Sequence, residues 1–387
     1  MKNVAIIYHY FASYRIPILR KLMTSEHVKY FLYSGISSEI EIKKIDPNFS
    51  RIPITKSGLR WFFLKNKWLL NKRFLWQTGL LTMILNTSYD SYIFLGSPYH
   101  LSTWVAAIIV RVKNKKVYFW MHGVYKEKLS FVDYIKLFVF YKIANGYFLY
   151  GNRSASILRR YKIRSSKNIH IVYNSLDYYK CLKMRKDITK DDIFSFRKIM
   201  FNDENIPIVC FIGRLNRTKK IDWLLSAQID LSRKYNKSFF NAIIIGDGAE
   251  KANLEVLARD GNMLNHVYFT GSLYKEREIS KILMHSDVCI NPGEIGLTCI
   301  HSMSYGTPVI SHNNLNKQMP EVEAVDCGLT GDLYDYEDYD SFLAVIEKWF
   351  KTYPIKDTDI IKKCQFTVDS YYNPNYQQII FDNALKN

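Results

Sequence analysis

The sequence lacks three features that would each point to a particular class of protein. No apolar run reaches the roughly 18–20 residues that cross a bilayer, so a membrane-spanning helix is not expected. The six cysteines among 387 residues form no C-x-x-C pair, which argues against a zinc site or a disulfide framework and favours reduced, buried thiols. No short internal repeat or low-complexity segment is present, which excludes solenoid and disordered classes. These absences leave a globular, cytoplasmic protein.

Acidic residues are scarce in the first half of the chain. Residues 1–180 hold 29 Lys and Arg against 8 Asp and Glu, a net charge of +21, whereas the remainder holds 25 against 28, a net charge of −3. Such an asymmetry favours a surface that meets a polyanion or an anionic membrane, although a lysine-rich composition without a partner is the alternative. Because no nucleic-acid-reading motif accompanies the charge, no specific nucleic acid partner is expected.

Short apolar runs alternate with helical patterns along the chain. The opening MKNVAIIYHY predicts a first buried strand, because its apolar run is too short for a signal peptide. Such alternation predicts an α/β protein with two doubly wound parallel sheets, divided by the charged stretch 173–192. The runs expected to form strands are 4–10, 91–96, 116–123, 146–151, 169–174, 206–213, 240–248, 266–271, 286–293 and 307–313, and helical patterns include 16–23, 101–112 and 130–144.

Two segments of the second half follow strands and carry candidate ligand-binding residues, because ligands of open parallel sheets sit at the carboxyl ends of strands. In FIGRLNRTKKID, a strand ends at Gly213, and Arg214 and Lys219 precede a helix. Two cations there suit a diphosphate, and a solvated basic loop is an equal alternative. In IIIGDGAEKANLEVLA, Gly246 and Gly248 permit a tight turn. A plain strand-to-helix turn is favoured over direct ligand contact for these glycines.

The stretch NPGEIGLTCIHSMSYGTPVI (291–310) has the pattern of a third strand-end loop followed by a short helix. The loop is expected to cover 293–297 and the helix 298–305. Free N–H groups at such a helix start favour an anion. Gly306 fits the position just past the helix end, and His301 should project back towards the helix start.

The segments GRLNRTKKID, IGDGAEKANLEVLA, VYFTG, SDVCINPGEIGLTCIHSMSYGTPVI and QMPEVEAVDCGLTGDL occur in this order. Together they resemble the donor-binding half of family 4 (group 1) glycosyltransferases, and WMHGV and VYNSLD extend a looser resemblance into the first half. The resemblance implies the GT-B fold, in which two Rossmann-like domains face each other across a cleft. Residues 1–180 would bind the acceptor, 195–365 would bind the nucleotide-sugar, and a helix in 366–387 would cross back to the first domain.

The resemblance also assigns roles to residues. Arg214 and Lys219 would bind the nucleotide diphosphate and stabilise its charge as the sugar departs, and Glu294 would lie beside the sugar. His122 would face the cleft and contact the donor or the acceptor, although a lone histidine is more often structural. Glu321 would start a helix near the site or act as a simple cap. The complete expected donor-site set is Gly213, Arg214, Lys219, Gly246, Gly248, Gly293, Glu294, Ile295, Gly296, Leu297, Thr298, His301 and Glu321.

One position departs from the family pattern. The family usually carries two glutamates separated by seven residues, and the second holds the nucleotide ribose. Alignment on Gly296 and Leu297 places Gly293 at the first position and His301 at the second. A histidine can still hydrogen-bond one ribose hydroxyl, but a bidentate carboxylate contact to two hydroxyls is lost. This is interpreted as an altered site and not as a decayed one, because Arg214 and Lys219 keep their spacing.

The resemblance implies a retaining, metal-independent transferase that uses a nucleotide-sugar as co-substrate without a further cofactor. A glycan or lipid-linked acceptor in surface polysaccharide assembly is expected by analogy, and a non-catalytic scaffold at a membrane surface is the alternative. Asp338-x-Asp340 resembles a metal motif but is better explained by a helix start. The basic and aromatic segment 59–81 favours contact with the inner face of an anionic membrane over buried packing. Residues 131–143 are similar, with a buried helix as the alternative.

Overall fold

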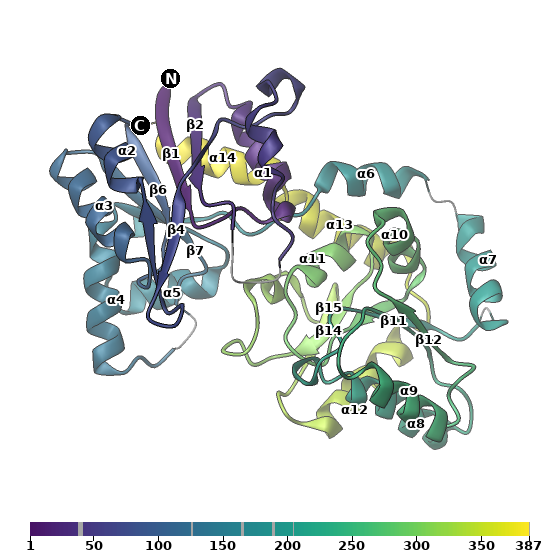
Figure 1. The fold of residues 1–387 in the computed structure, drawn as a ribbon. Helices are drawn as coiled ribbons and strands as arrows, with labels where there is room; N and C mark the ends of the chain where they lie inside the picture. Colours follow the sequence, from purple (N-terminus) through teal and green to yellow (C-terminus); the bar gives the residue numbers. More distant parts are fainter. Residues whose placement is uncertain (38–41, 125–126, 164–165, 188–189, 204, 387) are drawn as a thin grey trace. The chain divides into compact units, whose positions relative to one another are not determined.

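A computed structural model describes residues 1–386, except 38–41, 125–126, 164–165, 188–189 and 204. The chain divides into two compact units (Figure 1). Unit 1 comprises Met1–Asp177 together with Tyr371–Asn387, and unit 2 comprises Tyr178–Ser370. Both are α/β units built on a parallel sheet.

The described part of unit 1 contains a seven-stranded parallel sheet in the order β3-β2-β1-β6-β7-β8-β9. The chain winds outward from β1 in one direction and then returns to β6 and winds in the other. The boundary between β1 and β6 is therefore the topological switch point, where such sheets bind ligands. The strands are β1 (Lys2–Tyr8), β2 (Val28–Ser34), β3 (Trp61–Phe63), β6 (Ser91–Leu95), β7 (Lys116–Met121), β8 (Gly146–Leu149) and β9 (Ile169–Ile171).

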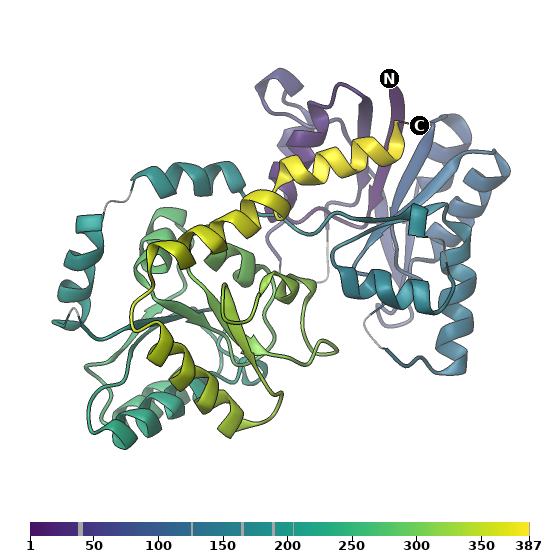
Figure 2. The same cartoon turned by 180° about the vertical axis from the view of Figure 1, so that it is seen from behind.

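Helices cover both faces of this sheet, which explains why its strands are apolar on both sides. In β1, Val4 and Ile6 pack with the helices on one face, and Ala5 and Ile7 pack with those on the other. The C-terminal helix α14 lies beside α1 on the first face (Figure 2). There the ring of Phe381 packs against the ring of Trp120, with the two ring centres 4.9 Å apart. The helices are α1 (Ile16–Met23), α2 (Leu80–Asn86), α3 (Leu101–Val112), α4 (Phe131–Ile143), α5 (Asn152–Arg160) and α14 (Pro374–Leu385).

Segment 59–81 forms β3, the antiparallel hairpin of β4 (Lys65–Leu69) and β5 (Phe74–Thr78), and the start of α2. Part of its apolar content is buried, including Trp61 and Leu75, whereas Phe62 and Leu70 are exposed. The segment therefore combines buried packing with exposed apolar side chains, because strands turn alternate side chains in opposite directions. Membrane contact by the exposed residues stays a prediction. Among the described residues, no helix is long and apolar enough to cross a bilayer.

The described part of unit 2 contains a six-stranded parallel sheet in the order β12-β11-β10-β13-β14-β15, and its switch point lies between β10 and β13. The strands are β10 (Ile208–Ile212), β11 (Asn241–Ile245), β12 (Val267–Gly271), β13 (Val288–Ile290), β14 (Val309–His312) and β15 (Gly331–Tyr334). The helices are α6 (Tyr178–Asp187), α7 (Lys190–Phe201), α8 (Ile221–Tyr235), α9 (Lys251–Asp260), α10 (Glu276–His285), α11 (Leu297–Ser304), α12 (Tyr339–Thr352) and α13 (Thr358–Tyr371).

Candidate functional site

The loops that follow β10 and β11 in unit 2 pack main chain against main chain beside the switch point. A Cβ atom on Gly246 would lie 1.9 Å from the carbonyl oxygen of Gly213, and one on Gly248 would lie 2.3 Å from that of Leu215. Both glycines have positive φ angles, 147° and 158°. The expected turn role of Gly246 and Gly248 is therefore confirmed, and it includes holding the Arg214 loop in place.

The loop after β13 joins this group through Gly293 and Lys219. The amide of Gly293 donates to the carbonyl of Lys219 at 3.0 Å, and Lys219 Nζ donates to the carbonyl of Glu294 at 2.6 Å. The Glu294 carboxylate lies 3.8 Å from the same ammonium. Burial lowers the pKa of Lys219, and the charge of Glu294 opposes that shift. Arg214 is exposed on the same loop, so one anchored and one exposed cation flank this strand end.

The start of α11 presents main-chain donors beside these cations. Gly296 precedes the helix without a side-chain cap, and among the described residues the amides of Gly296, Leu297 and Thr298 have no hydrogen-bond acceptor. The preceding amide, of Ile295, donates to Gln318 Oε1 at 2.7 Å. Unsatisfied N–H groups at a helix start attract an anion, as the loop pattern predicts. The helix ends before Gly306, whose φ of 76° agrees with the expected position.

Gln318 was not singled out from the sequence, although it fixes the shape of the loop after β13. Its Nε2 donates to Ser311 Oγ at 2.8 Å and to the carbonyl of His312 at 3.0 Å. Ser311 Oγ in turn donates to the carbonyls of Asn291 and Gly293. The buried side-chain amide of Gln318 therefore holds the loop after β13 in one conformation, because each lost hydrogen bond would leave a buried polar group unpaired.

His301 of α11 lies against an acidic residue from another helix. Its Nε2 is 2.7 Å from Oε1 of Glu276, the first residue of α10, and the Tyr305 hydroxyl donates to the same oxygen at 2.7 Å. Burial alone would raise the pKa of Glu276, but the hydrogen bonds from His301 and Tyr305 and the charge of Lys180 lower it to about 2. Glu276 is therefore an ionised, partly buried carboxylate, and the sequence pattern did not single it out.

Glu321 is buried beside the start of α11. Its Oε2 lies 4.0 Å from the position that a Cβ on Gly296 would take. Glu321 stands in the first turn of the short 3-10 helix Pro320–Ala324, whose N-cap is Met319, so a helix-start role for Glu321 stays a prediction. Its position next to Gly296 leaves a role at the donor site as a prediction.

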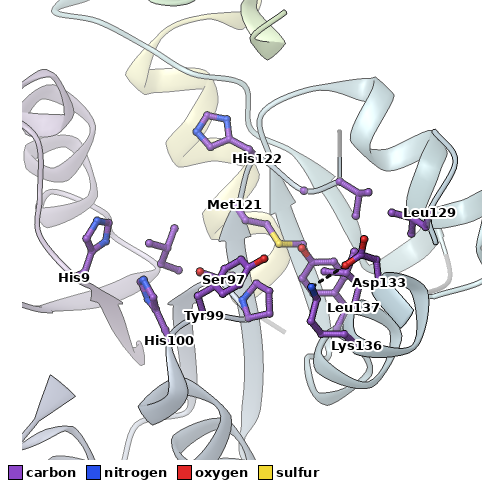
Figure 3. A pocket seen from close by; sticks show the side chains of 16 residues that line it. His9, Ser97, Tyr99, His100, Met121, His122, Leu129, Asp133, Lys136 and Leu137 are labelled. Atoms are coloured by element: carbon purple, nitrogen blue, oxygen red, sulfur yellow. Dashed lines mark hydrogen bonds and ion pairs between the residues drawn. The ribbon is translucent and has the colours of Figure 1, made fainter. Parts of the chain in front are cut away.

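Unit 1 contains a second candidate site, a pocket of about 570 Å³ at its own switch point. The pocket is lined by residues that follow β1, β6 and β7 and by one face of α4. Figure 3 shows His9 and His100 on one side of the pocket and Asp133 and Lys136 of α4 on the other. His122 also lines it, and its backbone carbonyl accepts a hydrogen bond from Ser154 Oγ at 2.5 Å. The expected position of His122 in a strand-end loop is observed.

The pocket histidines are neutral at physiological pH. Burial lowers the pKa of His9 to about 3, with smaller contributions from the charges of His100 and Arg15. Burial likewise lowers the pKa of His100 to about 4, and burial with the Arg15 charge lowers that of His122 to about 4. Among the described residues, Nδ1 of His9 has no hydrogen-bond partner. Neutral imidazoles can both donate to and accept from a hydroxyl group, which suits a polyol.

The opposite wall of the pocket mixes one ion pair with apolar side chains. Lys136 Nζ lies 2.9 Å from Asp133 and 5.5 Å from the centre of the Tyr99 ring. Met121 and Leu137 supply apolar surface nearby. Aromatic and apolar surface with a few polar groups is the usual lining of a small-molecule site.

The expected site residues thus divide between the two units. Lys219 and Glu294 meet in unit 2, Arg214 lies on the same loop as Lys219, and His122 lies in the pocket of unit 1. His9 and His100 were missed, although each follows a strand of the parallel sheet. Their position at strand ends was the signal that could have identified them.

Asp338 accepts a hydrogen bond from the Ser341 amide at 2.9 Å as the N-cap of α12. The helix-start explanation of Asp338-x-Asp340 is therefore confirmed. Within the described residues, no group of three or more His, Cys, Asp or Glu is arranged to hold a metal ion.

Comparison with known proteins gives a consistent result. Residues 192–365 match the family described as glycosyl transferases group 1. An uncharacterized glycosyltransferase of Methanocaldococcus jannaschii is 26% identical over 215 residues, which is 52% of each chain. The Escherichia coli O-antigen biosynthesis glycosyltransferase WclY is 30% identical over 151 residues, which is 37% of each chain. The chain thus spans about half the length of these curated relatives, or less.

Similarity in structure extends over almost the whole chain. The crystal structure of Anabaena HepE in complex with UDP superimposes with a TM-score of 0.70 at 15% sequence identity, covering 99% of both chains. At this identity the likeness shows the fold alone. The fold is GT-B, as expected from the sequence motifs.

Proposed function

Because residues 192–365 match the family of group 1 glycosyl transferases, we propose that this protein transfers a sugar from a nucleotide-sugar donor to a glycan or lipid-linked acceptor. The reaction is retaining and independent of metal, and it serves surface polysaccharide assembly. The E. coli relative named for O-antigen biosynthesis and the UDP bound to the Anabaena structure support this substrate class.

One observation in unit 2 carries the proposal. Lys219 is tied to the Glu294 loop, Arg214 is exposed beside it, and the start of α11 offers unsatisfied N–H groups among the described residues. Cations and main-chain donors fixed in advance stabilise negative charge as it develops on a leaving group. A nucleoside diphosphate is such a leaving group, and the same elements bind it before reaction.

The proposed chemistry needs no covalent intermediate. The acceptor hydroxyl attacks the anomeric carbon on the face from which the diphosphate departs, so the new glycosidic bond keeps the configuration of the old one. The C–O bond to the phosphate breaks, and the departing phosphate oxygen takes the proton of the hydroxyl. Arg214 and Lys219 stabilise the charge on that oxygen, so no dedicated carboxylate nucleophile is required.

The pocket of unit 1 is the proposed acceptor site. Its neutral histidines, the ring of Tyr99 and the ion pair of Asp133 with Lys136 are groups that can recognise hydroxyls and sugar rings. His122 lies among them and contacts the acceptor or the transferred sugar. The complete donor-site set predicted from the sequence, including Glu321, is retained as part of this proposal.

Unit 1 also carries a surface that suits the proposed contact with the inner face of an anionic membrane. Outside the pocket, α4 exposes Phe131, Val132, Ile135 and Val139, which lie on one side of a helix by their spacing. The hairpin exposes Leu70 beside Lys72 and Arg73 at its turn. Exposed apolar residues with nearby cations are typical of proteins that bind the membrane interface.

Vesicle binding tests this membrane contact. Replacing Phe131 and Ile135 with Ser removes exposed apolar area, whereas replacing Lys72 and Arg73 with Gln removes charge. Each change should lower partition onto vesicles containing 30 mol% anionic lipid by about tenfold, and neutral vesicles should respond only to the first. Unchanged partition in both variants would rule out this surface as the contact.

A non-catalytic scaffold at the membrane is the alternative function. Thermal unfolding with and without nucleoside diphosphates separates the two, because a ligand that binds only the folded state raises its stability by about 2.7 kcal/mol at a hundredfold excess over Kd. We expect UDP or GDP to raise Tm and the monophosphates to raise it less. Vesicle binding without any nucleotide response would favour the scaffold.

A further inference from the structure

The carboxylate of Glu276 lies beside His301, at a position where the family pattern has a glutamate. The family resemblance places a ribose-binding carboxylate at position 301, where this chain has a histidine. The structure brings Glu276 Oε1 to 2.7 Å from the Nε2 atom of that histidine. A carboxylate is therefore present directly beside the side chain of position 301, supplied by α10.

Both helices begin at the edge of the sheet where strands end. Glu276 is the first residue of α10, which follows β12, and His301 is in the second turn of α11, which follows β13. Thr298, one turn before His301, donates from Oγ1 to the carbonyl of Ile212 at 3.4 Å. The pair of Glu276 and His301 therefore lies close to the β10 strand end that leads to Arg214, at the edge where ligands bind.

The hydrogen bonds of Glu276 leave one carboxylate oxygen available. His301 and Tyr305 both bond Oε1, and within the described part of the chain Oε2 has no hydrogen-bond partner. Because an ionised carboxylate only accepts, His301 must donate through Nε2. The pair thus leaves the acceptor Oε2 of Glu276 and the Nδ1 atom of His301 to contact two neighbouring hydroxyls.

We propose that Glu276 binds the ribose of the nucleotide-sugar donor, with His301 as a second ribose contact and Tyr305 as a positioning residue. This inference rests on the proposed function, because it requires a nucleotide in unit 2. Two side chains on two helices then replace the bidentate grip that one carboxylate provides in the usual family pattern. A purely structural bond between α10 and α11 is the alternative that the experiment must separate.

Binding of ribose and deoxyribose nucleotides distinguishes the two. The full-length protein is titrated calorimetrically with UDP and with 2′-deoxy-UDP, or with GDP and its 2′-deoxy form if UDP does not bind. A hydrogen bond to a charged group corresponds to roughly 10–100-fold in affinity, so we expect the protein to prefer UDP by that factor. Glu276→Gln should weaken UDP by about tenfold or more and change 2′-deoxy-UDP by less than about threefold.

Two further variants make the test specific. Glu278→Gln is the matched control, because Glu278 lies on the same helix in an exposed pair with Lys275 at 3.5 Å, and it should leave both affinities unchanged. The exchange of Glu276→His with His301→Glu returns the carboxylate to α11 and should recover the preference for UDP. Because this exchange keeps both residue types, it remains informative if Glu276→Gln does not fold.

The possible failures are distinguishable. If Glu276→Gln weakens UDP and 2′-deoxy-UDP equally, or if the exchanged variant shows no preference, the pair is structural and the inference is wrong while the proposed function stands. If the unmodified protein binds neither UDP nor GDP, the proposed function fails, and this inference fails with it.

Discussion

The first half of the chain is strongly basic, yet the cations of the candidate anion site lie in the second half, in unit 2. The first 180 residues carry 29 Lys and Arg against 8 Asp and Glu, whereas the remaining residues carry 25 against 28. Yet the pocket of unit 1 is lined by histidines whose pKa values are lowered to about 3–4. The site of unit 2 presents Arg214 and Lys219. Net charge therefore does not locate the anion site, because burial decides which local groups keep a charge.

This contrast has a consequence for substrate recognition. A site with fixed cations and free amides suits a diphosphate, and a pocket of neutral imidazoles suits hydroxyl groups. The surplus charge of the first half then remains for long-range attraction to an anionic surface, which needs no defined pocket.

Removing the exposed cation of unit 2 should have the largest effect. Arg214→Ala is expected to lower the rate of donor hydrolysis or transfer by about 10²–10³, the scale on which losing one charge-stabilising donor acts. The matched control is Arg217→Ala, since Arg217 is an exposed residue of the same loop that pairs with Glu250 at 3.2 Å. Equal rates for Arg214→Ala and the unmodified protein would contradict the assignment of the diphosphate site.

Acid should destabilise the protein through the neutral histidines of unit 1. Their pKa values lie below the ordinary 6.5 in the folded state, so the unfolded chain binds more protons between pH 6.5 and about 4. These histidines should therefore leave the free energy of unfolding unchanged between pH 6.5 and 7.5 and lower it below pH 6.5, by about 1.4 kcal/mol per pH unit for each histidine. Glu276 keeps its charge throughout this window, because its pKa is about 2.

Urea unfolding at several pH values between 4.5 and 7.5 measures this slope. His100→Gln should reduce the slope of unfolding free energy against pH by the contribution of one histidine, about 1.4 kcal/mol per pH unit, whatever the substitution does to stability at pH 7. His27→Gln is the control, because His27 is exposed and should leave the slope unchanged. A slope that does not respond to His100→Gln would mean that this histidine is charged in the folded protein, and the pocket would no longer differ from the donor site.

Much of this architecture follows from the sequence, and the parts that do not have physical reasons. All the strands expected from apolar runs are present, because buried parallel strands are apolar on both faces. The hairpin of β4 and β5 was not expected. Its turn uses Leu70, Asn71 and Lys72 with φ angles of 48°, 49° and 66°, and only asparagine among these is a usual signal for that conformation.

The donor site shows the same division between local and distant information. The loop of Gly293 and the end of α11 at Gly306 depend on residues that are neighbours in the sequence, so both could be predicted. The contact of Glu276 with His301 could not, because it joins residues 25 positions apart on two different helices. The local sequence pattern therefore identifies the unusual His301 but not the Glu276 carboxylate beside it.

Removing a pocket imidazole should affect the acceptor and leave the donor unaffected. His122→Ala is expected to raise the acceptor KM or lower kcat by about tenfold, since the loss of a neutral hydrogen bond is about 1 kcal/mol and truncation also loosens the pocket. Donor affinity, measured by calorimetry with UDP, should stay within about twofold. A large loss of UDP affinity would instead assign His122 to donor binding.

The smallest effect on the transfer rate is expected from metal removal. Variants of Asp338 show whether this residue stabilises the fold or binds a metal. Treatment with EDTA should change the transfer rate by less than about twofold, since the cations Arg214 and Lys219 already occupy the place of a metal in stabilising the leaving group. Asp338→Ala should lower stability by about 1 kcal/mol, because Asp338 caps α12. Asp338→Asn keeps a capping side chain and should recover most of that loss. If activity instead falls in both variants and returns with added Mg²⁺ or Mn²⁺, the two carboxylates of 338–340 bind a metal, and a fixed positive charge from the protein is not sufficient for this reaction.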